Sequence, residues 1–158
     1  MKKTIALVCC VFSCCSCPLP GPNNTTDKSH VFTKAFYLEP PEGTEIHHAL
    51  LWEFRLLFGV VDQWQWHIEL TPSREFREWL IEDNVFELET VLSASQFNAV
   101  EDLNPAPDWF QVETDTARFN VYQSGDGRMR LFERISDGRI FMTDYGIQQV
   151  GMTFRPTT

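Results

Sequence analysis

Two neighbouring stretches of the sequence alternate between apolar and polar side chains, and this pattern constrains the fold most strongly. The first covers residues 52–58 and the second residues 64–70, with Gly59 and Asp62 in the short segment between them. Successive side chains on a β-strand point to opposite faces, so a period of two indicates a strand with one buried face. The two stretches therefore predict a β-hairpin.

A helix is expected directly after this hairpin. Thr71 and Pro72 form a typical N-cap and first helical position, and Phe76, Trp79 and Leu80 recur at a spacing that places them on one helix face. The helix should end near residues 83–84. Further along, residues 118–124, 128–135 and 139–143 are three strand candidates separated by Gly- and Asp-rich turns, and this predicts a β-meander.

The remaining segments are less regular. Residues 31–38 are rich in aromatic and β-branched side chains, which favours a first strand or an extended arm. Residues 85–103 favour an extended stretch and then a short helix from Ser95. The predicted fold class is α+β: an antiparallel sheet of five or six strands, made of the N-terminal hairpin and the C-terminal β-meander, with one main helix packed on it. The expected core is Trp52, Phe54, Phe58, Trp64, Trp66, Ile68, Phe76, Trp79, Leu80, Phe119, Val121 and Leu131.

Composition supports one folded domain and removes several classes of function. The chain has 158 residues, of which 43% are hydrophobic and 13% aromatic, enough for a substantial core. Its net charge of −9 argues against a general nucleic-acid binder, which needs a basic face. All five cysteines lie within residues 9–17, so the rest of the chain can form neither a disulfide framework nor a cysteine-ligated structural zinc site.

The start of the chain is typical of a targeting segment. Lys2 and Lys3 precede an apolar run over residues 4–12, which fits the ~7–15 residues of a signal-peptide core and falls short of the ~20 of a membrane-spanning helix. The stretch Val11-Phe12-Ser13-Cys14 resembles the lipobox of bacterial lipoproteins. That resemblance implies cleavage before Cys14 and attachment of acyl groups such as palmitate to it. Ordinary signal-peptide cleavage after Ser13 is the alternative.

The expected domain organisation follows from this leader. Residues 1–13 are the predicted signal peptide, residues 14–30 a lipidated N-terminus and flexible tether rich in Pro, Gly, Asn and Thr, and residues 31–158 a single α+β domain. Cys15 and Cys17 would lie beside the anchor, where they could pair, carry a further acyl group or stay free. The expected location is the bacterial cell envelope, lipid-anchored to the outer or inner membrane and facing the periplasm or the exterior.

Residues 64–147 are also similar to a type of small uncharacterised bacterial domain. The resemblance rests on three short motifs: Thr71-Pro72-Ser73 at a helix start, Pro107-Asp108-Trp109-Phe110 after it, and Asp144-Tyr145-Gly146 at the close of a meander. It implies the α+β fold and no particular activity.

The histidines offer weak evidence for catalysis or metal binding. A zinc site made of His67, Glu69 and either His47 or His48 is conceivable, but the alternation places His67 on a polar strand face, where a solvent-facing histidine is the simpler interpretation. The sequence contains neither a phosphate-binding glycine motif nor a nucleophile-elbow motif. We therefore predict no metal site, no cofactor and no catalytic residue.

Arginines are concentrated toward the end of the chain, where residues 116–158 hold six arginines and four acidic residues. Arg128 and Arg130 are two residues apart on one expected strand, Arg118 and Arg139 lie on neighbouring strands, and Arg118, Arg128 and Arg130 are the candidate anion-binding residues. These three could bind a carboxylate, a phosphate or an acidic partner, or could pair with the domain's own acidic residues. Trp109 follows a proline break, so it is either an aromatic contact for a ligand or a cap over the sheet edge.

These features predict a membrane-anchored lipoprotein with a non-catalytic binding or structural domain. Its partners would be the membrane, through the lipid, and an unspecified protein or small ligand, but not nucleic acid. One alternative is a small metal-dependent or hydrolytic envelope enzyme that uses His67 and nearby carboxylates. Another is an acidic inhibitor or immunity-type protein that acts through the acidic residues of the predicted helix.

Overall fold

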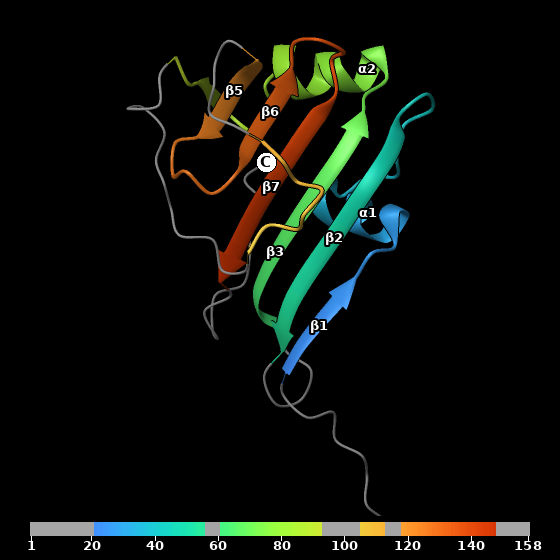
Figure 1. Ribbon diagram of the computed structural model, residues 1–158, viewed down its shortest axis with the longest axis vertical. Helices are drawn as coiled ribbons and strands as arrows, with labels where there is room; N and C mark the ends of the chain where they lie inside the picture. Colours follow the sequence, from blue (N-terminus) through green and yellow to red (C-terminus); the bar gives the residue numbers. More distant parts are fainter. Residues whose placement is uncertain (1–20, 56–60, 93–104, 113–117, 148–158) are drawn as a thin grey trace, which may run out of the picture.

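The computed structural model describes residues 21–55, 61–92, 105–112 and 118–147. In these residues the chain forms one antiparallel sheet of seven strands, in the order β1-β2-β3-β7-β6-β5-β4 (Figure 1). The strands are β1 (Gly21–Thr25), β2 (Glu45–Arg55), β3 (Val61–Thr71), β4 (Leu88–Thr90), β5 (Phe119–Ser124), β6 (Arg130–Arg134) and β7 (Ile140–Ile147).

The predicted hairpin and meander are both present. Strands β2 and β3 have eleven residues each and form ten residue pairs, with Leu51 opposite Trp66. Strand β5 pairs with β6, and β6 with β7, as the meander requires. Gly127 and Gly138 occupy positive-φ positions (75° and 70°) in the two turns, a conformation that glycine adopts without the steric cost other residues incur. The β7 strand then pairs with β3 and joins the two halves into one sheet.

The prediction of a strand or extended arm over residues 31–38 is wrong, because a helix, α1 (Lys28–Phe36), occupies most of this segment. The side chain of Asp27 caps it by accepting a hydrogen bond from the backbone N–H of His30 at 2.9 Å. Its buried residues, Val31, Phe32, Ala35 and Phe36, recur at helical spacing and face the sheet. Aromatic content suggested a strand, but the packing of this apolar helix face decides the structure.

The predicted helix after the hairpin begins two residues later than expected. Thr71 is still part of β3, and Ser73 caps α2 (Arg74–Arg77) by accepting a hydrogen bond from the N–H of Phe76. The helix continues as a short π-helical segment, η2 (Glu78–Glu82), whose C-cap Asp83 lies at the predicted end. Phe76 and Leu80 are buried, as the spacing predicted.

The predicted fold class is therefore wrong in its proportions. The sheet has seven strands and not five or six, and the described residues hold only short helical segments in place of one main helix. Strand β1 lacks apolar alternation, and β4 has only three residues, so neither has a sequence pattern that identifies it. Both form because long neighbouring strands offer unpaired backbone groups at the edges of the sheet. Strand β1 also lies within the segment expected to be a flexible tether.

Both faces of the sheet are covered. Helix α1 lies behind β2 and β3 in Figure 1, and the segment 105–112 crosses the opposite face in front of the sheet. The first core, on the helix side, contains residues such as Trp66, Ile68, Phe76 and Leu131. The second core, under the segment 105–112, consists of Val91, Phe110, Phe119, Val121, Phe132 and Phe141.

Some expected core residues lie elsewhere. Trp52 and Phe54 are only half-buried, because the residues of β2 that face the first core are Ala49 and Leu51. Trp64 and Trp79 are partly buried and pack against that core. The backbone of Gly146 passes so close to Trp64 that a Cβ atom there would lie 2.5 Å from the indole. Phe58 lies outside the described residues, and the other predicted core residues are buried.

Candidate functional site

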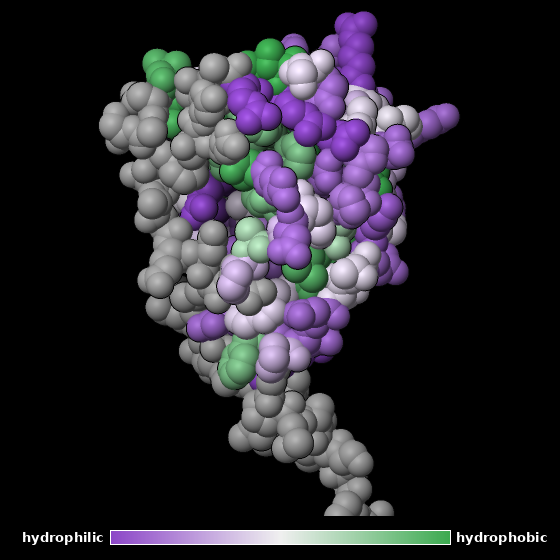
Figure 2. Space-filling view, in the orientation of Figure 1, coloured by the Kyte–Doolittle hydropathy of each residue, from purple (hydrophilic) through white to green (hydrophobic). Residues whose placement is uncertain are grey.

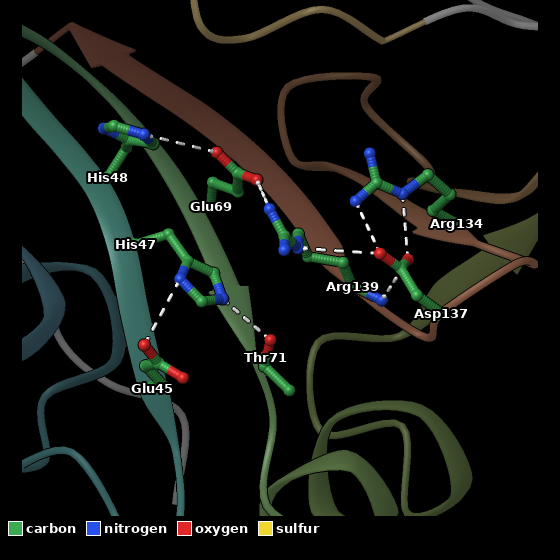
Figure 3. A network of polar contacts seen from close by, with 8 residues as sticks. All are labelled: Glu45, His47, His48, Glu69, Thr71, Arg134, Asp137 and Arg139. Carbon is green, nitrogen blue, oxygen red and sulfur yellow. Dashed lines mark hydrogen bonds and ion pairs between the residues drawn. The ribbon is translucent and has the colours of Figure 1, made fainter.

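A chain of charged side chains joins three strands and a turn at one end of the sheet (Figure 3). Glu69 on β3 lies at its centre, almost fully buried. One carboxylate oxygen accepts a hydrogen bond from Arg139 at 2.8 Å, and the other lies 3.9 Å from Nε2 of His48 on β2. Arg139 also lies 3.7 Å from the carboxylate of Asp137 in the turn between β6 and β7.

The turn itself adds a second guanidinium group. Arg134, the last residue of β6, donates two hydrogen bonds to Asp137, at 2.8 and 2.6 Å. These bonds are the main reason why the pKa of Asp137 falls to about 2. The guanidinium of Arg134 also lies 5.4 Å from the ring centroid of Phe141, a cation–π contact. Arg134 is thus held in place from two sides.

The segment 105–112 covers the same face with two aromatic rings. Trp109 stacks on His48, with ring centroids 5.2 Å apart and planes inclined by 20°. Phe110 enters the second core, where its ring lies edge-on to His67 at 4.8 Å and contacts Phe132 and Phe141. Phe110 therefore fixes the segment to the sheet, while Trp109 remains at its border.

A pocket of about 250 Å³ opens between this segment and the charged chain. We call it the arginine–tryptophan pocket, and its lining consists of Glu69, Trp109, Gln111, Arg118, Phe119, Arg134 and Phe141. Hydrophilic side chains gather at the upper end of the visible face, around the ends of β2 and β3 and around α2 (Figure 2). The pocket thus combines guanidinium groups, a buried carboxylate and an aromatic surface.

The structure brings together only some of the predicted site residues. Arg118 and Trp109 line the same pocket. Arg128 lies near the opposite end of β5, where it donates a hydrogen bond to Asp126 at 2.6 Å and borders a separate pocket of about 440 Å³. Arg130 is buried, and its Nε donates to the carbonyl oxygen of Gly127. The three predicted arginines therefore do not form one site, and Arg128 pairs with an acidic residue of its own turn.

Arg134 was not considered as a site residue, and Arg139 was noted only as a strand neighbour of the candidate arginines, although both sequence positions carry a signal. They flank the predicted turn at residues 136–138, so the two strand ends of this hairpin must bring them together. Asp137 in that turn accepts hydrogen bonds from both sides, including one from the backbone N–H of Arg139. The turn prediction was enough to place two arginines around one carboxylate.

The expectation of a solvent-facing His67 is wrong. Its side chain is 1% exposed, because the segment 105–112 covers the strand face that looked polar in sequence. Burial, and then the nearby charge of Arg130, lower its pKa to about 4. Among the described residues, neither ring nitrogen has a hydrogen-bond partner.

The burial of His67 matters for the alternative of a small enzyme that uses this histidine. A general base must reach a substrate proton, and the ring of His67 lies beneath Phe110. In the described part of the chain, no group of three or more His, Cys, Asp or Glu residues could hold a metal ion. Cys14, the predicted lipidation site, lies outside the described residues.

The acidic helix face is partly neutralised. Glu78 pairs with Arg74 at 2.7 Å, and Arg77 pairs with Glu82 at 3.3 Å and with the buried Glu133 at 2.7 Å. These arginines interrupt the acidic surface that an inhibitor of a basic protein would need.

Comparison of the chain with protein-family models, with curated proteins and with solved structures finds no match. Within the described ranges, no helix has both the length and the apolar character needed to cross a bilayer.

Proposed function

We propose that this protein is a bacterial envelope lipoprotein whose domain binds a small anionic ligand in the arginine–tryptophan pocket. The single observation that carries the binding function is the position of Arg118, Arg134 and Trp109 around one pocket of about 250 Å³. The proposal of an anchor is supported by the leader, in which Cys14 ends a lipobox-like stretch after a short apolar run.

The charges around the pocket favour an anion. The guanidinium groups of Arg118 and Arg134 line the pocket, and that of Arg139 adjoins it beside Glu69 and Asp137. Guanidinium groups present paired donors that match carboxylate and phosphate oxygens.

The aromatic part of the pocket favours a ligand with a flat or apolar portion. Trp109 is held against His48 by ring stacking and lines the pocket, whereas Phe119 and Phe141 are almost fully buried behind the lining. An aromatic ring beside a few placed polar groups is a combination that small-molecule sites use. The preferred ligand class is therefore a small carboxylate or phosphate that carries a ring.

Benzoate is a suitable probe, because it joins a carboxylate to a flat ring. Calorimetric titration of the full chain with benzoate and with benzyl alcohol tests the proposal directly. We expect benzoate to bind and the uncharged alcohol to bind at least tenfold more weakly, since one charge-assisted hydrogen bond contributes about 1.5–3 kcal/mol. Equal affinity for the two compounds would contradict an anion site.

The anchor has its own test. Mass spectrometry of the protein purified from bacterial membranes should find a mature N-terminus at Cys14 that carries acyl groups. Two or three acyl chains are needed for stable anchoring, so the expected mass increase is that of a multiply acylated residue. A mature chain with an unmodified Cys14 would contradict the lipoprotein proposal.

A further inference from the structure

Three apolar residues of β2 lie on one face of the sheet outside both described cores. Leu50, Trp52 and Phe54 alternate along the strand and are all half-buried. None of them belongs to either core cluster of the described residues. We call this row the β2 apolar stripe, and a half-exposed row of this kind is a feature of an interaction surface.

The stripe extends to the end of the sheet where the described part of the chain begins. Strand β1 runs antiparallel to β2, with Gly21 opposite Arg55, Pro22 opposite Phe54 and Asn24 opposite Trp52. Figure 1 shows β1 at the lower end of the sheet and α2 at the upper end. The N-terminal segment therefore enters the fold beside Phe54.

Covalent geometry limits how far this end can lie from an anchor at Cys14. The segment from Cys14 to Gly21 contains seven residues beyond the cysteine, and a fully extended chain spans at most about 3.3–3.6 Å per residue. Gly21 thus cannot lie more than about 25 Å from an acylated Cys14. An anchor at Cys14 would therefore keep the β1 end of the sheet, near which the stripe lies, within about 25 Å of the acylated residue.

We infer, on the basis of the proposed anchor, that the β2 apolar stripe rests on the surface of the lipid bilayer. Tryptophan and other amphipathic side chains favour the membrane–water interface, where an apolar body meets lipid and a polar group meets water. Arg55, the next residue of the strand, is paired with Glu53, so the charge of its guanidinium is compensated within the domain.

The rest of the molecule is compatible with this orientation. The acidic residues of α2 and η2 lie at the opposite end of the sheet, away from an anionic membrane surface. The arginine–tryptophan pocket lies at the same far end, near the turn between β6 and β7, because its lining includes Arg134 and the end of β3 at Glu69. A soluble ligand could reach the pocket while the stripe is in contact with lipid.

The test uses full-length acylated protein in vesicles of phosphatidylcholine and phosphatidylglycerol whose acyl chains carry bromine, a short-range quencher of tryptophan fluorescence. We expect these vesicles to quench the wild type, and Trp52→Phe to remove most of this quenching. Trp109→Phe is the matched control and should leave it unchanged, because Trp109 lies at the pocket end. Circular dichroism establishes that both variants are folded.

Equal quenching of the wild type and of Trp52→Phe by brominated lipid would overturn the inference. A Trp52 that neither brominated lipid nor soluble acrylamide reaches would also overturn it, since another part of the chain or a second copy would then cover the stripe. The anchor is checked by mass spectrometry on the same preparation. An unmodified Cys14 contradicts the anchor and with it this orientation, whereas an acylated protein with unchanged quenching contradicts the orientation alone.

Discussion

The indole of Trp109 stacks on the imidazole of His48, with 5.2 Å between the ring centroids, and so ties the segment 105–112 to strand β2. An aromatic pair contributes about 0.5–1.5 kcal/mol beyond its buried area. His48→Ala should therefore lower the free energy of unfolding by about 1 kcal/mol, measured by urea denaturation. His48→Phe is the control, since it keeps a stacking ring. Equal losses in both variants would show that the stacking contributes nothing.

The ion pair between Glu69 and Arg139 should be strongly coupled. Removing Arg139 takes the close hydrogen-bond donor from an almost buried carboxylate, and His48 is more distant at 3.9 Å, so Arg139→Gln should cost about 2 kcal/mol. In a double-mutant cycle with Glu69→Gln, we expect a coupling energy of about 1–2 kcal/mol. Additive effects of the two substitutions would contradict the pairing.

His67 should make the protein sensitive to mild acid. Its pKa is depressed from 6.5 to about 4 in the folded state, so the unfolded chain binds more protons and stability falls as the pH drops from about 6.5 toward 4. The loss is up to about 3 kcal/mol. His67→Leu should remove this part of the pH dependence, as measured by urea denaturation at several pH values. An unchanged pH profile in the variant would exclude His67 as the cause.

Asp144 should contribute to the pH dependence of stability with the opposite sign to His67. Burial raises its pKa from 3.8 to about 6, so folding favours the protonated acid and its contribution to stability is lost as the pH rises through 6. Asp144→Asn keeps the acceptor for the N–H of Tyr145 and should stabilise the protein at pH 7.5 by about 1–2 kcal/mol. The same substitution should have little effect near pH 4. A gain that is independent of pH would contradict the assignment.

The sequence predicted the strands and turns of the hairpin and the meander well. It predicted poorly which strand faces are buried by residues distant in sequence. The alternation around Trp66 and Ile68 identified β3, and the Gly- and Asp-containing turns identified the meander. In β2, apolar residues occupy both alternating sets, so the period could not tell whether Leu51 or Trp52 faces the core. His67 looked exposed because its neighbours are polar, whereas the ring that buries it, Phe110, lies more than forty residues further along the chain.

For the candidate site too, the sequence identified individual residues but not which of them lie together. Arg118 and Trp109 were singled out from the sequence and prove to share a pocket, and Arg134 and Arg139 could have been found from the turn that they flank. The separation of Arg128 from Arg118 follows from strand direction, since the two residues lie at opposite ends of β5. Only the assembled sheet shows which arginine lies beside Trp109.

Comparison of two arginine variants tests the central claim most directly. Benzoate affinity is measured by calorimetry for wild type, Arg118→Gln in the arginine–tryptophan pocket, and Arg128→Gln at the other end of β5. We predict that Arg118→Gln weakens binding by about tenfold or more, the loss of one charge-assisted hydrogen bond, and that Arg128→Gln leaves it unchanged. Unchanged affinity in Arg118→Gln, or no benzoate binding to the wild type, would contradict the anion site.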